Sequence, residues 1–298
     1  MTEAHTSASL QPVYPGWHIM AIPHDPELTE KLQEGVLRED TDARGGFAFN
    51  LDFSVPYIVT AIHAGGRIRD ELQPLMKISA KERAYEDDIA TDRIIQGLPC
   101  TIWGLDSRAE YDLNRTPDTA LPLTPEMFWG VRVYQEQPTP EMNRQSLEKY
   151  NAFYHFVGSC VKIVLERFGI CIVYDMHSYN IDRQVAKGFA SPPVFNLGTE
   201  LLDRSKWKKP IDGWLQQLRL IEIPGFQTTV AENEVFSGRG EFCRRLTRWD
   251  PNILVLPTEI SKIYMNAREG IVYDAVISSL QKGLQSAITT HARSISDP

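Results

Sequence analysis

Short, almost wholly apolar runs alternate with longer amphipathic stretches along most of the chain. The apolar runs are rich in Val, Ile and Leu and end at Gly, Pro or polar residues, which is typical of buried strands. These predicted strands cover residues 57–62, 101–105, 170–176, 194–197 and 253–260. Helical composition and spacing predict helices at residues 81–97, 141–167, 207–222 and 269–290.

This alternation predicts the α/β class of fold, with helices covering both faces of a central sheet. We therefore expect three layers, α/β/α, around a mixed sheet. The length of 298 residues suits one large domain, and we find no internal repeat or low-complexity segment. Residues 1–50 are mixed and rich in residues that break regular structure. The prediction is a single domain over residues 1–298 with an irregular lead-in over residues 1–50.

Composition and charge narrow the class of function. Hydrophobic residues make up 42% of the chain and charged residues 23%, as in ordinary globular proteins. The net charge of -8 argues against a nucleic-acid binder, which normally has a basic face. The 4 cysteines form no C-x-x-C pair, so they predict neither a cysteine zinc site nor a disulfide framework. Without a secretory signal or an apolar run of about 18 residues, we expect a cytoplasmic protein.

Three predicted strands end in residues that could carry chemistry. His63 follows the first strand, His177 follows the strand at 170–176, and Glu259 lies at the end of the last one. Sheets of this class bind ligands at the carboxyl ends of their strands. A hydrolytic zinc ion takes three protein ligands, usually histidines and a carboxylate, and leaves one position for water. His63 and His177 are therefore candidate ligands, and Glu259 is a candidate general base.

The residues alone leave the carboxylate ligand open. The acidic cluster Glu86-Asp87-Asp88 could supply it, although acidic residues at the start of a helix often only complement the helix dipole. Each histidine taken singly is also typical of a buried structural residue, and Glu259 could pair with Lys262. Only the joint placement of these residues favours a metal site.

A second polar stretch, SRAEYDLNRTPD at residues 107–118, could bind a carboxylate. Arg108 and Arg115 each have a guanidinium that can grip a carboxylate with two hydrogen bonds, and Asn114 adds an amide donor. A solvated turn, with Asp112 as its cap, is the alternative interpretation of the same residues. Composition does not decide between the two.

Together these segments resemble the N-formylglutamate amidohydrolase family from about residue 55 to about residue 285, and more distantly the zinc carboxypeptidases. The family's motifs follow one another here in the family's order. They correspond to His63-Ala64-Gly65, Asp88-Ile89-Ala90-Thr91-Asp92, Ser107-Arg108, Asp112-Leu113-Asn114-Arg115-Thr116-Pro117-Asp118, Asp175-Met176-His177-Ser178, Asn233 to Gly240, Glu259 and Tyr264-Met265. The Asp-Leu-Asn-Arg and Asp-x-His-Ser matches are specific, whereas Arg239 interrupts the glycine pair of the family's late loop.

The resemblance implies a zinc-exopeptidase-like fold, one zinc ion and a role for each residue. His63 and His177 would ligate the zinc, and Glu259 would act as base and then as acid to the leaving amine. Arg108 would polarise the scissile carbonyl and stabilise its oxyanion. The pair Asn114-Arg115 would hold the carboxylate of the substrate.

One departure concerns the third ligand. Zinc carboxypeptidases have a His-x-x-Glu motif, but the third residue after His63 is Gly66. The carboxylate must therefore come from elsewhere, and we favour Asp88, with Glu86 and Asp92 as alternatives. Asp88 and Asp92 are four residues apart in a predicted helix, which predicts that they share one helical face.

The leading hypothesis is a zinc-dependent amidohydrolase that cleaves an N-acyl amino acid, N-formyl-like, with a free carboxylate. Its partner would be this small molecule, with no nucleic acid and no membrane. One alternative is a zinc carboxypeptidase that acts on short peptides with the same residues. Another is a non-catalytic binding protein on the same fold, which the changed loop at Arg239 favours.

Overall fold

A computed structural model describes residues 26–34 and 39–296. The predicted strands are present as β3 (Tyr57–Ala61), β4 (Cys100–Gly104), β5 (Cys171–Tyr179), β6 (Phe195–Leu197) and β8 (Ile253–Ser261). The predicted long helices are α4 (Pro140–Phe168), α6 (Lys208–Arg219) and α8 (Asp274–Ser296). Further elements are α1 (Pro26–Gln33), β1 (Glu39–Thr41), β2 (Phe47–Leu51), α5 (Ile181–Ala186), β7 (Val230–Glu232), α7 (Glu241–Trp249), β9 (Met265–Asn266) and β10 (Ile271–Val272).

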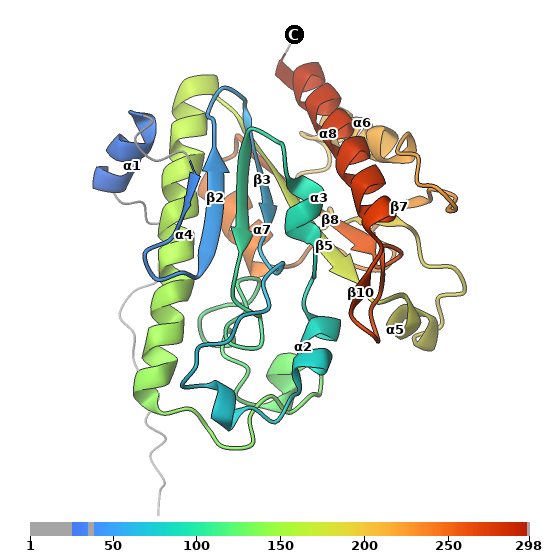
Figure 1. Cartoon of the computed structure of the whole chain (residues 1–298). Coiled ribbons are helices and arrows are strands. Elements are labelled where there is room, and N and C mark those ends of the chain that lie inside the picture. The colour runs from blue at the N-terminus through green and yellow to red at the C-terminus, as the bar shows by residue number, and fades with distance from the viewer. Residues whose placement is uncertain (1–25, 35–38, 297–298) are drawn as a thin grey trace, which may run out of the picture.

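The described residues form an eight-stranded mixed sheet in the order β1-β2-β4-β3-β5-β8-β6-β7 (Figure 1). Strands β4, β3, β5 and β8 are parallel to one another, whereas β2 is antiparallel to β4 and β6 is antiparallel to β8. Because parallel strands need long crossovers, helices are carried to the faces of the sheet. The predicted α/β class with a mixed central sheet is confirmed.

Aromatic contacts show which helices cover each face. On one face Phe156 of α4 packs on Phe49 of β2, with ring centroids 4.5 Å apart, and α7 joins α4 through Phe242. On the other face Tyr174 of β5 packs on Trp214 of α6 at 4.9 Å, and α8 lies against α6. Apolar side chains therefore fill both interfaces between the sheet and its helices, as three-layer folds require.

The helix predicted at residues 81–97 is two short helices, α2 (Ala80–Glu86) and α3 (Thr91–Ile95). The connection leaves helical geometry because Asp87 is extended and Ala90 has a φ of 66°. The prediction that Asp88 and Asp92 share a helical face is therefore wrong, since Asp88 lies between the helices.

The sequence predicts an irregular lead-in over residues 1–50, yet α1, β1 and most of β2 are regular within its described part. Residues 1–25 and 35–38 of that stretch lie outside the described residues. Strand β2 hydrogen-bonds to β4 and packs Phe47 and Phe49 on α4, so it belongs to the core. Tertiary pairing gives this strand its structure despite the glycines that precede it.

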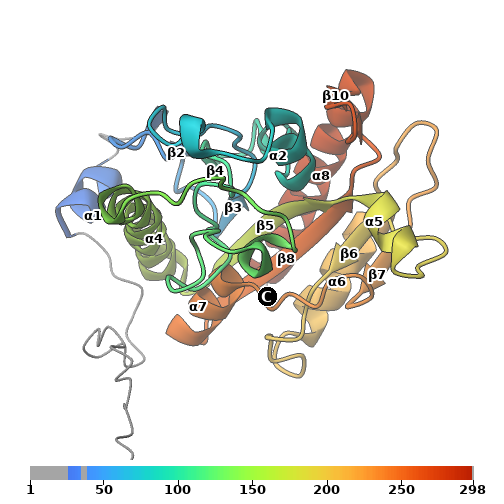
Figure 2. The ribbon, with the colours of Figure 1, turned by 90° about the horizontal axis from the view of Figure 1, so that it is seen from below.

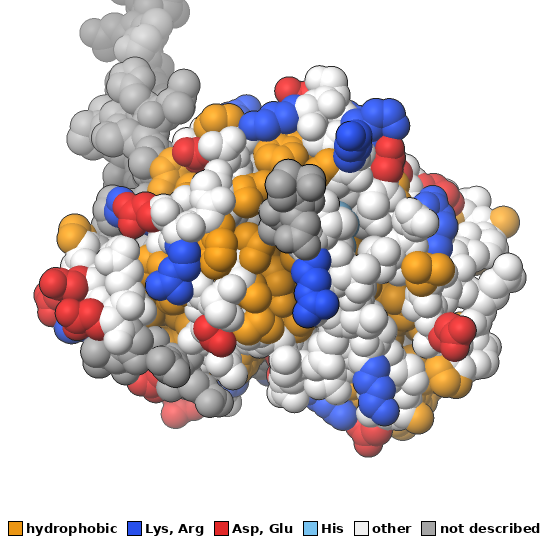
Figure 3. Space-filling model, turned by 90° about the horizontal axis from the view of Figure 1, so that it is seen from above, with side chains coloured by type: hydrophobic (Ala, Val, Ile, Leu, Met, Phe, Trp, Pro, Cys, Tyr) orange, Lys and Arg blue, Asp and Glu red, His pale blue; other side chains and the backbone are white. Residues whose placement is uncertain are grey.

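The carboxyl ends of the four parallel strands point to the lower edge of the molecule in Figure 1, and Figure 2 shows that edge from below. Figure 3 shows the opposite edge, where hydrophobic side chains gather in the centre and charged side chains are scattered around them. No helix within residues 26–34 and 39–296 is long and apolar enough to cross a membrane. The polar residues singled out by the sequence lie at the carboxyl edge, which is the usual ligand edge of such sheets.

Candidate metal centre

Strand register brings His177 and Glu259 side by side. Strands β5 and β8 are parallel, and His177 is paired with Glu259 and Asp175 with Pro257. Side chains alternate between the faces of a sheet, so Asp175 and His177 point to the face of α4 and α7, away from Tyr174. His63 follows β3, the neighbour of β5 on its other side. The three predicted strand ends therefore converge, as the sequence suggests.

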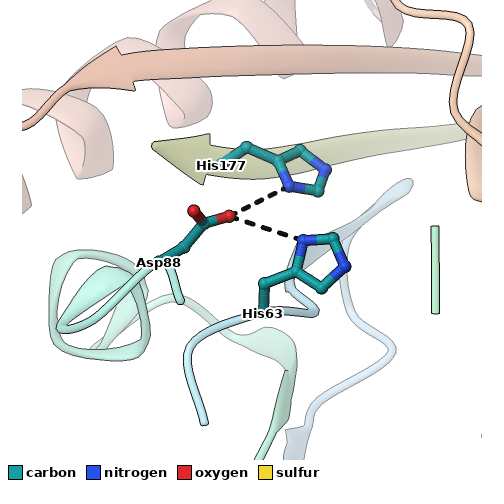
Figure 4. A group of neighbouring side chains, drawn as sticks. All are labelled: His63, Asp88 and His177. Atoms are coloured by element: carbon teal, nitrogen blue, oxygen red, sulfur yellow. Dashed lines mark hydrogen bonds and ion pairs between the residues drawn. The ribbon is translucent and has the colours of Figure 1, made fainter. Parts of the chain in front are cut away.

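Asp88 reaches this edge from the connection between α2 and α3. Its Oδ2 lies 3.3 Å from Nδ1 of His177 and 3.5 Å from Nδ1 of His63 (Figure 4). The ligand-type atoms of the three residues all lie within 4.8 Å of one another, and all three residues are buried. The structure thus brings together His63, Asp88 and His177.

The far nitrogen of each imidazole contacts another carboxylate. His63 Nε2 lies 2.9 Å from Asp112 Oδ1, and His177 Nε2 lies 2.8 Å from Asp175 Oδ2. An ionised carboxylate only accepts hydrogen bonds, so each Nε2 carries the proton and donates it. In the neutral imidazoles Nδ1 then presents a lone pair, and both lone pairs face Asp88.

This convergence fits a cation. Nδ1 of His63 is buried and has no hydrogen-bond partner among the described residues. Two imidazole lone pairs and one carboxylate oxygen that face one another repel unless a positive charge lies among them. Imidazole nitrogen and carboxylate oxygen are zinc ligands, and a ligating histidine usually donates its other N–H to a carboxylate. The donor set and its outer partners therefore match those of a zinc site.

Charge in the cluster is predominantly negative. Burial alone would raise the pKa of Asp88, but the adjacent imidazoles of His177 and His63 hold the pKa of this carboxyl well below its ordinary value. Burial likewise opposes the charge of Asp112, yet Arg108 and His63 hold the pKa of Asp112 well below its usual range. Burial disfavours the imidazolium of His177, but Asp175 raises the pKa of His177 well above its ordinary value. The cluster therefore favours positive charge, either as a proton or as a metal ion.

The predicted carboxylate binders lie around Asp112. Arg108 Nη2 donates to Asp112 Oδ2 at 2.7 Å, and Arg115 Nε donates to the same oxygen at 3.3 Å. Both guanidinium groups lie over the ring of Trp129, at 4.3 and 5.6 Å from its centroid. Asn114 accepts a hydrogen bond from the amide of Phe242 at the start of α7. Asp112 therefore links the arginines to His63.

A cavity of 230 Å³ lies beside His177 and Glu259. Asn114 lines this cavity, whereas Arg108 and Arg115 are not among its lining residues. Burial raises the pKa of Glu259 to about 8, so this carboxyl can exchange protons near neutral pH. The described residues that line the cavity are Asn114, Asp175, His177, Gly198, Phe236, Ser237, Gly238, Arg239, Gly240, Cys243, Pro257 and Glu259.

Glycines allow the wall formed by residues 236–240 to approach the sheet. A Cβ atom at Gly198 would lie 2.3 Å from the backbone nitrogen of Gly238. Gly238 itself has a φ of 78°, which side chains with a Cβ rarely adopt. Arg239 follows on this wall and pairs with Glu200 at the surface. The late loop predicted from the sequence is therefore part of the cavity.

The alternatives to Asp88 have other partners. Glu86 forms hydrogen bonds of 2.6 and 2.8 Å with the guanidinium of Arg183. Asp92 lies in the first turn of α3, outside the cluster of His63, Asp88 and His177. Lys262 donates to the carbonyl oxygens of Tyr85 and Asp87 instead of pairing with Glu259.

Sequence reasoning missed the contact of Asp112 with His63. The residues alone suggest a turn cap, and Asp112 Oδ1 does accept the amide of Asn114 at 2.8 Å. The same oxygen also accepts a hydrogen bond from Nε2 of His63, a residue 49 positions away in the sequence. The available signal was the position of Asp112, two residues before Asn114 and within a segment already predicted to bind a ligand.

Fold and site define an α/β protein with a buried cluster of two histidines and one carboxylate at the carboxyl edge of a mixed sheet. The chain belongs to the N-formylglutamate amidohydrolase family, because the model of that family matches residues 55–265. This confirms the resemblance and places the protein among hydrolases that act on amides and take small-molecule substrates. A search of curated proteins gave no match.

Two solved structures show the same fold, and a third is less similar. An N-formylglutamate amidohydrolase from Ralstonia eutropha JMP134 is 19% identical with a TM-score of 0.67, covering 84% of this chain and 98% of that one. A gene product from Agrobacterium tumefaciens is 15% identical with a TM-score of 0.59, covering 84% and 96%. A metallo-carboxypeptidase from Burkholderia cenocepacia is 13% identical with a TM-score of 0.39, covering 92% and 70%.

Proposed function

We propose that the protein is a zinc-dependent amidohydrolase that cleaves an N-acyl amino acid, N-formyl-like, with a free carboxylate. The observation that carries the proposal is the convergence of two imidazole lone pairs and the Asp88 carboxylate beside a cavity that contains Glu259. Membership of the amidohydrolase family supports the reaction class.

His63 and His177 would hold one zinc ion through Nδ1, and Asp88 through a carboxylate oxygen. Zinc in such a site supplies Lewis-acid chemistry, which lowers the pKa of water to about 7 and polarises a carbonyl. Asp112 and Asp175 would keep the two imidazoles in the ligating tautomer by accepting their Nε2 protons.

Glu259 would take the proton of the attacking water and pass it to the leaving amine. Its position next to His177 in the strand register and its pKa of about 8 suit this transfer. Arg108 would stabilise the charge that develops on the carbonyl oxygen, since its guanidinium is already fixed by Asp112 and Trp129.

Asn114 and Arg115 would hold the carboxylate of the substrate. Asn114 lines the cavity, and Arg115 contacts Asp112 through Nε, so Nη1 and Nη2 are the donors that would grip a carboxylate. The cavity volume of 230 Å³ is below the roughly 300–1,000 Å³ of sites for drug-sized ligands. This size favours an N-acyl amino acid over a peptide.

A screen of N-formyl and N-acetyl amino acids with zinc-loaded protein tests the proposal, with short peptides as the comparison. We expect hydrolysis of an N-acyl amino acid that stops with a chelator and returns with zinc. Amidation of the substrate's α-carboxylate should raise KM sharply. Faster cleavage of short peptides would indicate a zinc carboxypeptidase instead. Zinc binding without turnover of either class would indicate a non-catalytic binding protein, and a chain that takes up no zinc would refute both enzymatic functions.

A further inference from the structure

The connection that carries Asp88 and the last turn of α2 before it are together tied to the carboxyl ends of all four parallel strands. The contacts come from residues that follow β3, β4 and β5 and from the residue directly after β8. They are Asp88 N to His63 O at 2.9 Å, Ser107 Oγ to Asp87 Oδ1 at 2.9 Å, Asn180 Nδ2 to Tyr85 O at 2.8 Å, and Lys262 Nζ to Tyr85 O at 2.7 Å and Asp87 O at 2.8 Å. One short segment thus forms hydrogen bonds with the ends of strands that are far apart in the sequence.

Lys262 is the unusual member of this set. Its side chain is buried, with 4% of the residue exposed. Burial lowers the pKa of its amine, although Asp88 and Asp87 oppose that change. A buried ammonium group is costly unless its protons are donated. Lys262 donates one proton to the carbonyl of Tyr85 in the last turn of α2 and one to the carbonyl of Asp87 in the connection.

The peptide group between Asp87 and Asp88 is held at both ends. Lys262 binds its oxygen, and the carbonyl of His63 accepts its N–H. A peptide group is planar, so fixing both its oxygen and its N–H fixes that plane and the position of the Asp88 Cα. The carbonyl of Asp88 in turn accepts hydrogen bonds from N and Oγ1 of Thr91 at 3.2 and 2.7 Å, so both peptide groups that flank Asp88 are held and the direction of its side chain is set. Ala90, two residues on, has a left-handed φ of 66°, so the connection does not continue the helix that would direct Asp88 elsewhere.

We propose that Lys262 is a positioning residue, which holds the Asp88 carboxylate in the metal-binding geometry by anchoring the carbonyl groups of Tyr85 and Asp87. The inference rests on the proposed zinc site. Lys262 does not face the cavity beside Glu259 and donates its protons to the backbone, so it acts through Asp88.

Lys262→Met tests this role because it removes the ammonium group and keeps an unbranched side chain. Lys81→Met is the matched control: it removes an ammonium from the exposed end of α2, where Lys81 pairs with Glu269. Zinc affinity, measured by competition with a chromophoric chelator, should fall about 10- to 100-fold in Lys262→Met, the range typical of outer partners of metal ligands. Lys81→Met should leave it unchanged. The visible spectrum of bound Co²⁺ should change only in Lys262→Met.

A double-mutant cycle separates positioning from general support of the fold. In an Asp88→Asn background, Lys262→Met should change zinc affinity much less than in the wild type, because the carboxylate it positions is gone. Equal effects in both backgrounds would overturn the proposal, as would a lower thermal midpoint of metal-free Lys262→Met with unchanged zinc affinity. Lys262→Gln keeps one shorter donor and serves if Lys262→Met does not fold. It should bind zinc with intermediate affinity, and wild-type affinity would overturn the proposal.

Failure of the zinc site itself is distinguishable from failure of this inference. If the wild-type chain binds no zinc, the proposed function fails together with the role of Lys262. If the wild type binds zinc and Lys262→Met binds it equally well, only the role of Lys262 is overturned.

Discussion

A buried histidine lies on each face of strand β5, and the two histidines have opposite surroundings. On the face of α6 and α8, His291 lies between two neutral groups: the hydroxyl of Tyr174 donates to Nδ1 at 2.7 Å, and Nε2 donates to the carbonyl of Pro210 at 2.7 Å. On the other face, His177 lies between the carboxylates of Asp175 and Asp88. Burial is common to both, so the partners make the difference.

The charge of the hydrogen-bond partners determines whether each imidazole is more stable in its neutral or its positively charged form. Burial lowers the pKa of His291 to about 4, although the bond to the Pro210 carbonyl opposes this, so the ring is neutral and both its nitrogens are satisfied. The pKa of His177 is raised well above its ordinary value despite burial, chiefly by Asp175. A neutral imidazole satisfies the first site, whereas the second needs a cation. This difference supports a structural role for His291 and the proposed role of His177 as a ligand.

The largest expected effect comes from removing a ligand. His63→Ala or His177→Ala should weaken zinc binding by more than the roughly 10- to 100-fold typical for loss of an outer partner, and should abolish hydrolysis. His291→Ala should instead lower the free energy of unfolding by about 1–3 kcal/mol, because it leaves polar partners unsatisfied, with zinc affinity unchanged. Chelator competition and urea unfolding of the metal-free proteins measure the two quantities. Loss of zinc binding in His291→Ala would break the distinction between the faces.

Glu259→Gln should separate chemistry from metal binding on the charged face. The amide keeps the shape of the side chain but cannot accept the proton, so kcat should fall by about 10²- to 10⁴-fold while zinc remains bound. The exposed Glu222, which lines a groove beside α8, provides the matched control Glu222→Gln, for which we expect wild-type turnover. Turnover by Glu259→Gln at the wild-type rate would remove Glu259 from the mechanism.

The parallel strands and long helices could be predicted from the sequence because strands buried on both faces are continuous apolar runs. Helix α7 was not predicted. It has nine residues, among them Glu241 and three arginines, so its sequence has few apolar positions that could indicate a buried helical face. Its place in the core is evident only from the packing of Phe242 on α4. Strand β2 was also missed, since its pairing with β4 depends on a partner about 50 residues away.

The site could be predicted in part. His63 and His177 follow from strand ends and register, and Asp88 follows from the resemblance together with the acidic cluster. The shared helical face of Asp88 and Asp92 was wrong because tertiary contacts, including Lys262, break the helix.

A smaller effect should distinguish two neighbours on β5 that hold these histidines. Asp175→Asn removes the charge that stabilises the ligating tautomer of His177, so zinc affinity should fall about 10- to 100-fold. Tyr174→Phe, one position away, removes the hydroxyl that donates to His291 and should cost about 1–3 kcal/mol of unfolding free energy. Zinc titration and urea unfolding of both variants measure zinc affinity and stability for each. A change in zinc affinity for Tyr174→Phe would contradict the predicted difference between the two positions.

The last effect is confined to acidic pH. The pKa of His291 is lowered to about 4 in the folded chain, against about 6.5 in an unfolded chain. A lowered histidine pKa means that folding favours the neutral ring, so this contribution is fully present above pH 6.5 and is lost as the pH falls toward 4. Its size is about 3 kcal/mol. Unfolding free energies of metal-free wild type and His291→Gln should therefore differ most near neutral pH and converge on acidification. The uncharged amide does not titrate, whereas the carboxylates of the metal centre titrate alike in both proteins. A difference that stays constant between pH 7 and pH 4 would show that His291 is not held neutral by its surroundings.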